Sequence, residues 1–77
     1  MKKKPSLSPK QKATLFIIAK MMRTTGMTPT QRELVVVLGI TQNAVRDRLA
    51  ALSAKGYIRL LPRVARGIVL VEHRKSA

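Results

Sequence analysis

The spacing of apolar side chains along this chain changes once, from a helical repeat to a strand-like alternation. Before Gly56, apolar residues recur every three or four positions, as Leu15, Ile18 and Met22 do. This spacing is typical of the buried face of a helix. After Gly56 the period becomes two, which is typical of a half-buried strand. The pattern therefore predicts helices first and strands afterwards.

Capping signals divide the helical part into three segments, Ser8–Arg23, Thr30–Leu38 and Thr41–Lys55. The first two segments begin with SPKQ and TQRE, which are capping boxes whose first and fourth residues hydrogen-bond reciprocally. Gly39 and Gly56 supply stop signals after the second and third segments. The stretch LVVVL in the second segment is rich in β-branched residues and fits a buried strand equally well. The caps at both ends favour a helix there.

A short hairpin with a basic turn is predicted after the helices. Ile58 and Leu60 share one face of the first strand, and Ile68 and Leu70 share one face of the second. The turn between them, PRVARG at residues 62–67, contains two arginines. Two alternating runs separated by a turn with proline and glycine predict a β-hairpin.

Together these elements predict a mostly α-helical fold with a small β-hairpin. A very short connection containing Gly39 joins the second and third helices, as a helix-turn-helix requires. The hairpin behind it makes the fold a winged helix-turn-helix. We expect a flexible basic arm at residues 1–7, the winged helix-turn-helix domain at residues 8–72 and a tail at residues 73–77.

The charge of the chain narrows the class of partner. Sixteen Lys and Arg residues face three acidic ones, which gives a formal net charge of +13. Such a surface favours an acidic partner, either nucleic acid or an anionic membrane. No apolar run approaches the roughly 20 residues that span a bilayer, so we expect a cytoplasmic, nucleoid-associated protein without a membrane partner. The lysines at positions 2–4 fit a solubilising tail or a phosphate-contacting arm equally well.

Several kinds of chemistry are not expected. The chain has no cysteine and a single histidine, His73, so disulfides and thiolate metal sites are excluded and no metal or other cofactor is expected. The sequence offers no Ser/His/Asp set, no carboxylate pair at a plausible spacing and no glycine-rich phosphate loop. We therefore expect a protein that is not an enzyme.

The third predicted helix has two different sides when it is plotted at 100° per residue. The buried side carries Val45, Leu49 and Leu52. The opposite side carries polar residues followed by alanines: Asn43, Asp47, Ala50 and Ala54, flanked by Gln42 and Arg46. Most exposed helical faces are simply solvated. Here the alanines would let the helix lie close to a groove floor, and the position after a tight turn favours base reading in the major groove.

Other polar residues are expected to contact DNA phosphates, which position a protein without reading sequence. They lie near the starts of the first two helices and in the hairpin turn: Lys10, Lys12, Thr30, Gln31, Arg63 and Arg66.

The chain also resembles the N-terminal DNA-binding domain of LexA-type repressors. The stretch from Leu7 to Gly39, around TGMTPTQRELVVVLGI, resembles that family's first two helices without apparent gaps. NAVRDRLAALSAKGYIRL looks like its recognition helix and first wing strand, and RGIVL resembles the return strand. The family reads operators with the N-terminal part of its third helix. By resemblance, base reading falls on Thr41, Gln42, Asn43, Ala44, Arg46 and Asp47.

Three departures from the family pattern change what the resemblance implies. The turn before Asn43 is one residue shorter, and Arg46-Asp47 stands where the family has an acidic pair, so a different operator is expected. The sequence ends at Ala77, and we expect the domain to stand alone without the family's protease and dimerisation domain. Self-cleavage is therefore not carried over.

A possible contact surface comes from apolar residues outside the predicted core: Phe16, Met21, Val36 and Val37. Several exposed apolar residues close together indicate a surface for a homodimer or another protein. An equally weighted alternative is that the predicted core positions are wrong by a few residues and that these side chains are buried.

Taken together, the sequence predicts a sequence-specific double-stranded DNA-binding transcriptional regulator, a small repressor of bacterial or phage type. One alternative is an architectural DNA-binding protein, which shares the electrostatics but discriminates little between sequences. Another is a winged-helix protein-interaction module that modulates a different regulator.

Overall fold

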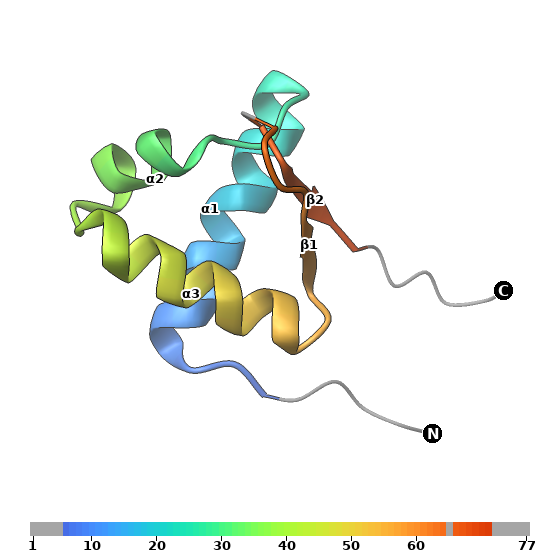
Figure 1. Cartoon of the computed structure of the whole chain (residues 1–77). Helices are drawn as coiled ribbons and strands as arrows, with labels where there is room; N and C mark the ends of the chain where they lie inside the picture. The colour runs from blue at the N-terminus through green and yellow to red at the C-terminus, as the bar shows by residue number, and fades with distance from the viewer. Residues whose placement is uncertain (1–5, 65, 72–77) are drawn as a thin grey trace, which may run out of the picture.

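Three helices precede a two-stranded hairpin, in the order that the sequence predicts (Figure 1). The structure is a computed structural model, and it describes residues 6–64 and 66–71. The elements are α1 (Pro9–Thr25), α2 (Gln31–Leu38), α3 (Gln42–Ala54), β1 (Ile58–Leu60) and β2 (Ile68–Leu70). The prediction of a winged helix-turn-helix is thus confirmed. Most of the predicted arm and the whole predicted tail lie outside the described residues.

Both predicted capping boxes are present and fix where α1 and α2 begin. The Ser8 hydroxyl accepts from the Gln11 amide at 3.2 Å, and the Gln11 side chain accepts from the Ser8 amide at 3.1 Å. Thr30 and Glu33 make the same reciprocal pair at 3.1 and 2.9 Å. Residues 34–38 are therefore helical despite their β-branched side chains, because the capping box satisfies two of the amides at the helix start, those of Thr30 and Glu33.

The turn between α2 and α3 depends on Gly39. Its backbone is left-handed, with φ of 67°, and its amide donates to the Val35 carbonyl at 2.9 Å. A residue with a Cβ would pay about 1–2 kcal/mol for this conformation. Thr41 then caps α3, because its hydroxyl accepts from the Ala44 amide at 3.1 Å. The two helices are thus joined by three residues, which sets the angle at which α3 leaves α2.

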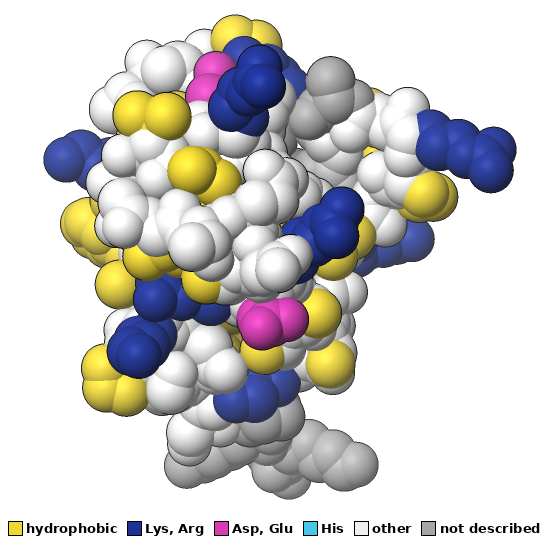
Figure 2. Space-filling view, turned by 60° about the vertical axis from the view of Figure 1, so that its left-hand side comes forward, with side chains coloured by type: hydrophobic (Ala, Val, Ile, Leu, Met, Phe, Trp, Pro, Cys, Tyr) yellow, Lys and Arg dark blue, Asp and Glu magenta, His cyan; other side chains and the backbone are white. Residues whose placement is uncertain are grey.

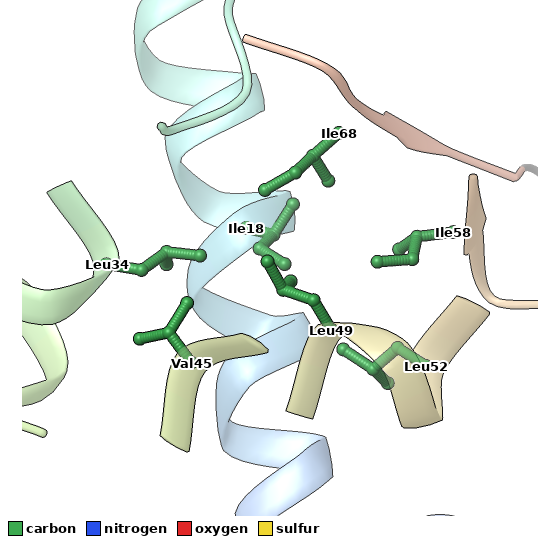
Figure 3. Close-up of a cluster of buried hydrophobic side chains, with 7 residues drawn as sticks. All are labelled: Ile18, Leu34, Val45, Leu49, Leu52, Ile58 and Ile68. Carbon is green, nitrogen blue, oxygen red and sulfur yellow. The ribbon is translucent and has the colours of Figure 1, made fainter. Parts of the chain in front are cut away.

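The hydrophobic core draws on every helix and strand (Figure 3). Its buried members are Ile18 from α1, Leu34 from α2, Val45, Leu49 and Leu52 from α3, Ile58 from β1 and Ile68 from β2. In Figure 3 these side chains point toward one another from the surrounding elements. The buried stripe predicted for α3 is confirmed residue for residue. One side of α3 is consequently packed against the core, and the opposite side faces outward.

Two predicted core positions are wrong. Met22 is 41% exposed, because it lies one turn beyond Ile18 and faces an open hollow that it shares with Met27 and Leu70. Leu60 is 39% exposed although Ile58, two residues earlier, is buried. Its cross-strand partner Ile68 is buried, so at this level of the hairpin the core reaches β2 but leaves the Leu60 side chain partly uncovered.

The hairpin is antiparallel and is tied to the helices by a buried hydrogen bond. Ile58 pairs with Leu70, and Leu60 pairs with Ile68. The hydroxyl of Thr28, in the α1–α2 connection, donates to the Ile68 carbonyl at 2.7 Å. At the base of the turn, a side chain in place of Gly67 would collide with the Leu61 carbonyl, so glycine is required there.

Thr28→Val removes this hydroxyl while keeping the shape of the side chain. Thr28 is only 8% exposed, so the loss leaves a carbonyl without its donor in a site that water barely reaches. We expect the free energy of unfolding to fall by about 1–3 kcal/mol, measured by urea denaturation. Thr28→Ser, which keeps the hydroxyl, is the control and should lose less. A valine variant more stable than the serine variant would contradict this role for the hydrogen bond.

Candidate nucleic-acid interface

The outward side of α3 is polar at its start and small afterwards. Its exposed members are Gln42, Asn43, Arg46 and Asp47, followed by Ala50 and Ala54. We call the first four the polar face of α3. Val45 and Leu49 are buried behind it, with at most 1% of their surface exposed. Packing therefore holds the polar face in a fixed orientation, and the alanines leave no long side chain between the helix and an approaching surface.

Thr41 and Ala44, two other members of the predicted base-reading set, are partly occupied within the domain. The Thr41 hydroxyl is exposed but accepts the Ala44 amide as the helix cap. Ala44 is half-buried, so only part of its methyl group is accessible. The structure thus brings all six predicted base-reading residues to the first turns of α3, with the polar face as its most accessible part.

A side-chain hydrogen bond joins the starts of α2 and α3. The Gln42 amide donates to the Gln31 side-chain oxygen at 3.1 Å. Thr30, the cap of α2, is next to Gln31 and is half-buried. Two predicted phosphate contacts therefore lie at the N-terminal end of α3, beside the free amides that begin α2. Such amides attract anions.

The start of α1 lies at the other end of α3. The Lys55 ammonium donates to the Ser6 carbonyl at 2.9 Å and to the Gln11 side chain at 2.8 Å. Lys10 and Lys12 are exposed on this first part of α1. The 13 residues of α3 span about 20 Å, longer than the roughly 12 Å width of a major groove. Predicted phosphate contacts at both ends of α3 are therefore suitably separated for the two sides of one groove.

Cationic groups lie on more than one side of this part of the molecule. Figure 2 shows Lys and Arg side chains at several places around the face and a basic projection at its right-hand edge. Arg63 is exposed in the hairpin turn, where its backbone is left-handed with φ of 63°. We call the hairpin with its turn, residues 58–70, the wing. Arg63 is thus presented outward at the wing turn.

Arg66, the other predicted wing contact, is held inside the domain. Its guanidinium donates to both Glu33 carboxylate oxygens, at 2.8 and 3.0 Å, and to the Thr28 carbonyl at 2.9 Å. The hydrogen bond from Arg66 lowers the pKa of Glu33 from 4.5 to about 2, with help from the Thr30 amide. The same pair raises the pKa of Arg66. DNA contact by Arg66 stays a prediction, while its contact with α2 is observed.

Only one of the two roles of Glu33 can be predicted from the sequence. Its spacing from Thr30 predicts the capping box, which is local. Its ion pair is made with a residue 33 positions away, and no local pattern indicates such a contact. The Gln31–Gln42 hydrogen bond was missed for the same reason, although both residues were singled out individually.

The predicted apolar contact surface is largely exposed. Phe16 is 59% exposed, Val36 is 76% exposed and Val37 is 52% exposed, whereas Met21 is half-buried. The first three side chains are therefore outside the core, and the core stripe predicted for α3 is correct. What covers this surface stays a prediction.

Within residues 6–64 and 66–71, no group of three or more acidic or histidine side chains is placed to bind a metal ion. No helix in the same part of the chain has the length and apolar character that crossing a membrane requires.

Comparison with known families gives a match over most of the sequence. The model of the LexA DNA-binding domain matches residues 4–67. This chain belongs to the LexA DNA-binding domain family. The resemblance predicted from the helix-turn-helix and wing motifs is thereby confirmed.

Individual LexA-family relatives agree with this assignment. The LexA repressor of Tolumonas auensis is 41% identical over 66 residues, covering 84% of this chain and 32% of that protein. The LexA repressor of Pseudoalteromonas atlantica is 43% identical over 67 residues, covering 86% of this chain and 32% of the relative. The LexA repressor of Shewanella sediminis is 38% identical over 71 residues, covering 91% of this chain and 34% of that protein. This chain spans about a third of the length of these relatives.

The Glu33–Arg66 pair makes the stability of this LexA-family domain depend on pH. Because the folded pKa of Glu33 lies near 2 rather than 4.5, its stabilisation is complete above about pH 4.5 and is lost as the pH falls toward 2. Glu33→Gln keeps a capping-box residue but removes the charge. We expect wild type to exceed this variant in thermal stability near neutral pH, and the difference to shrink between pH 4.5 and 2.

Arg66→Met is the matched control, since it removes the same pair from the other side and should show the same pH dependence relative to wild type. A difference between wild type and Glu33→Gln that stays constant over this range would contradict the assignment.

Proposed function

We propose that this chain binds double-stranded DNA sequence-specifically as a transcriptional repressor and places α3 in the major groove. The observation that carries the proposal is the polar face of α3, which is exposed and held in place by the buried stripe behind it. Membership of the LexA DNA-binding domain family supports it, and the relatives above are named LexA repressors.

Each residue of the polar face has a hydrogen-bonding pattern that suits a base edge. Asn43 and Gln42 offer the donor and acceptor pair that matches adenine, and Arg46 offers two donors that match guanine. Asp47 accepts from the cytosine amino group. The adjacent Arg46 and Asp47 differ in charge, so we propose a base preference at their positions unlike that of an acidic pair.

Phosphate contacts are proposed at the two ends of α3 and on the wing. Lys10 and Lys12 contact phosphates near the C-terminal end of α3, and Thr30 and Gln31 contact them near its N-terminal end. Arg63 makes the contact from the wing. A formal net charge of +13 supplies the long-range attraction to the DNA polyanion. An architectural DNA binder would share this attraction. The fixed polar face of α3 favours sequence reading, since attraction alone does not need it.

The exposed apolar surface supports a second, separate proposal of a protein contact. Phe16, Val36 and Val37 are each more than half exposed, and a patch of exposed apolar side chains is typical of a protein contact. We propose that a second copy of the chain, or another protein, covers them when the domain acts on DNA.

Selection of bound sequences from a random duplex pool tests the proposed function. At about 0.15 M salt, we expect enrichment of a defined consensus, because the polar face of α3 discriminates between bases. A palindromic consensus would indicate that two copies bind together. The double variant Val36→Glu/Val37→Glu, selected in parallel, should then yield only a half-site if this surface joins the copies. Absence of any enrichment with the wild-type chain would refute sequence-specific binding.

Substitutions in the polar face of α3 should change specificity, not only affinity. Asn43→Ala or Arg46→Ala should cost roughly 1–3 kcal/mol of binding free energy on the selected sequence and relax base preference at one position. Arg63→Ala is the matched control, since it removes the same charge as Arg46→Ala but should weaken all sequences alike. The measurement is affinity for the consensus and for single-base variants. Wild-type discrimination by Asn43→Ala would show that the reading face is misplaced.

A further inference from the structure

The wing is too short to hold its own position. Each strand has three residues, and an isolated hairpin of this kind is marginal in water at best. Ile58 and Ile68 anchor the base of the hairpin in the core. Its turn, by contrast, carries exposed residues from Leu61 to Val64. The orientation of the turn relative to α3 must therefore come from specific contacts beyond the core.

Glu33 supplies such a contact at the start of α2. Its carboxylate receives two hydrogen bonds from Arg66, which precedes β2, and one from the Thr30 amide. The Arg66 guanidinium also donates to the Thr28 carbonyl, while the Thr28 hydroxyl donates to Ile68. One residue of α2 is thus bonded simultaneously to its own helix cap and, through a planar two-point contact, to the wing. Bidentate geometry of this kind fixes direction as well as distance.

The same contacts reduce what Arg66 can offer to DNA directly. Both hydrogens of one terminal nitrogen are used, one by Thr28 and one by Glu33, and the second terminal nitrogen also donates to Glu33. The carboxylate cancels the guanidinium charge locally. A neutralised cation releases few counterions from DNA, so its direct contribution to salt-dependent binding is small.

We propose that Glu33 is a positioning residue for DNA binding, which acts through Arg66 to hold the wing where Arg63 meets a phosphate. This inference rests on the proposed function, since it concerns how that interface is assembled. Glu33 itself touches no DNA in this arrangement. The acidic side chain of Glu33 strengthens binding to DNA because it orients the wing, from which the Arg63 guanidinium contacts a phosphate.

The sign of one substitution separates this role from simple electrostatics. Glu33→Gln removes a negative charge from a DNA-binding domain, which by charge alone should strengthen binding. If Glu33 positions the wing, the same substitution should weaken binding several-fold and should lower the slope of log K against log salt by about 0.9, the value of one phosphate contact. Glutamine still suits the capping box, so α2 should keep its start.

The experiment measures duplex affinity over a range of salt concentrations for wild type, Glu33→Gln, Arg63→Ala and the double variant. Glu33→Gln should weaken binding when Arg63 is present and have no weakening effect in the Arg63→Ala background. Binding of Glu33→Gln as tight as wild type, or equal weakening in both backgrounds, would overturn the proposal.

A readout without DNA keeps this test distinct from that of the proposed function. The Leu61 amide donates to the Gly67 carbonyl across the base of the wing turn at 2.8 Å. Release of the wing should speed hydrogen exchange at this amide in Glu33→Gln, while the Leu34 amide within α2 stays protected. The salt series uses an arbitrary duplex and starts at low salt, where binding needs no sequence preference. A failed selection would thus refute sequence reading and leave the positioning role measurable, whereas unchanged exchange at Leu61 would overturn the positioning role alone.

Discussion

The packing of α3 by one side only is the constraint on which the rest of the structure depends. Val45, Leu49 and Leu52 are buried against Ile18 and Leu34, so α3 cannot rotate about its axis without exposing them. Burial of such side chains contributes about 1.5–3 kcal/mol each to the stability of the fold. The orientation of the residues proposed to meet DNA is therefore set by residues that never approach it.

Much of this arrangement follows from local sequence, because its causes are local. The capping boxes at Ser8 and Thr30, the glycine at position 39 and the stripe of α3 each act within a few residues, and all are found as predicted. Patterns of this kind also located the exposed side of α3. Met22 and Leu60 fit the same periodicity yet lie outside the core, since periodicity gives a side chain's face but not how far the neighbouring elements extend.

Contacts between distant segments could not be predicted in this way. Glu33 and Arg66 were each given one role from their surroundings in the sequence, and neither role includes the other residue. Their pairing depends on where the hairpin returns, which is decided by the burial of Ile58 and Ile68. The wing is thus joined to the helices by its apolar base, by the buried Thr28–Ile68 hydrogen bond and by the ion pair of Arg66 with Glu33. An apolar base is insensitive to pH and salt, whereas an ionic contact near the turn depends on both.

The hydrogen bond between Gln42 and Gln31 gives the interface a further property. The orientation of the Gln42 amide, and so which of its ends faces outward, is shared with a residue on a different helix. A substitution at position 31 that meets no base would still alter what Gln42 presents to one. On the proposed role of Gln42, the base preference at its position therefore depends on residue 31 as well, and α2 affects the choice of DNA sequence without entering the groove.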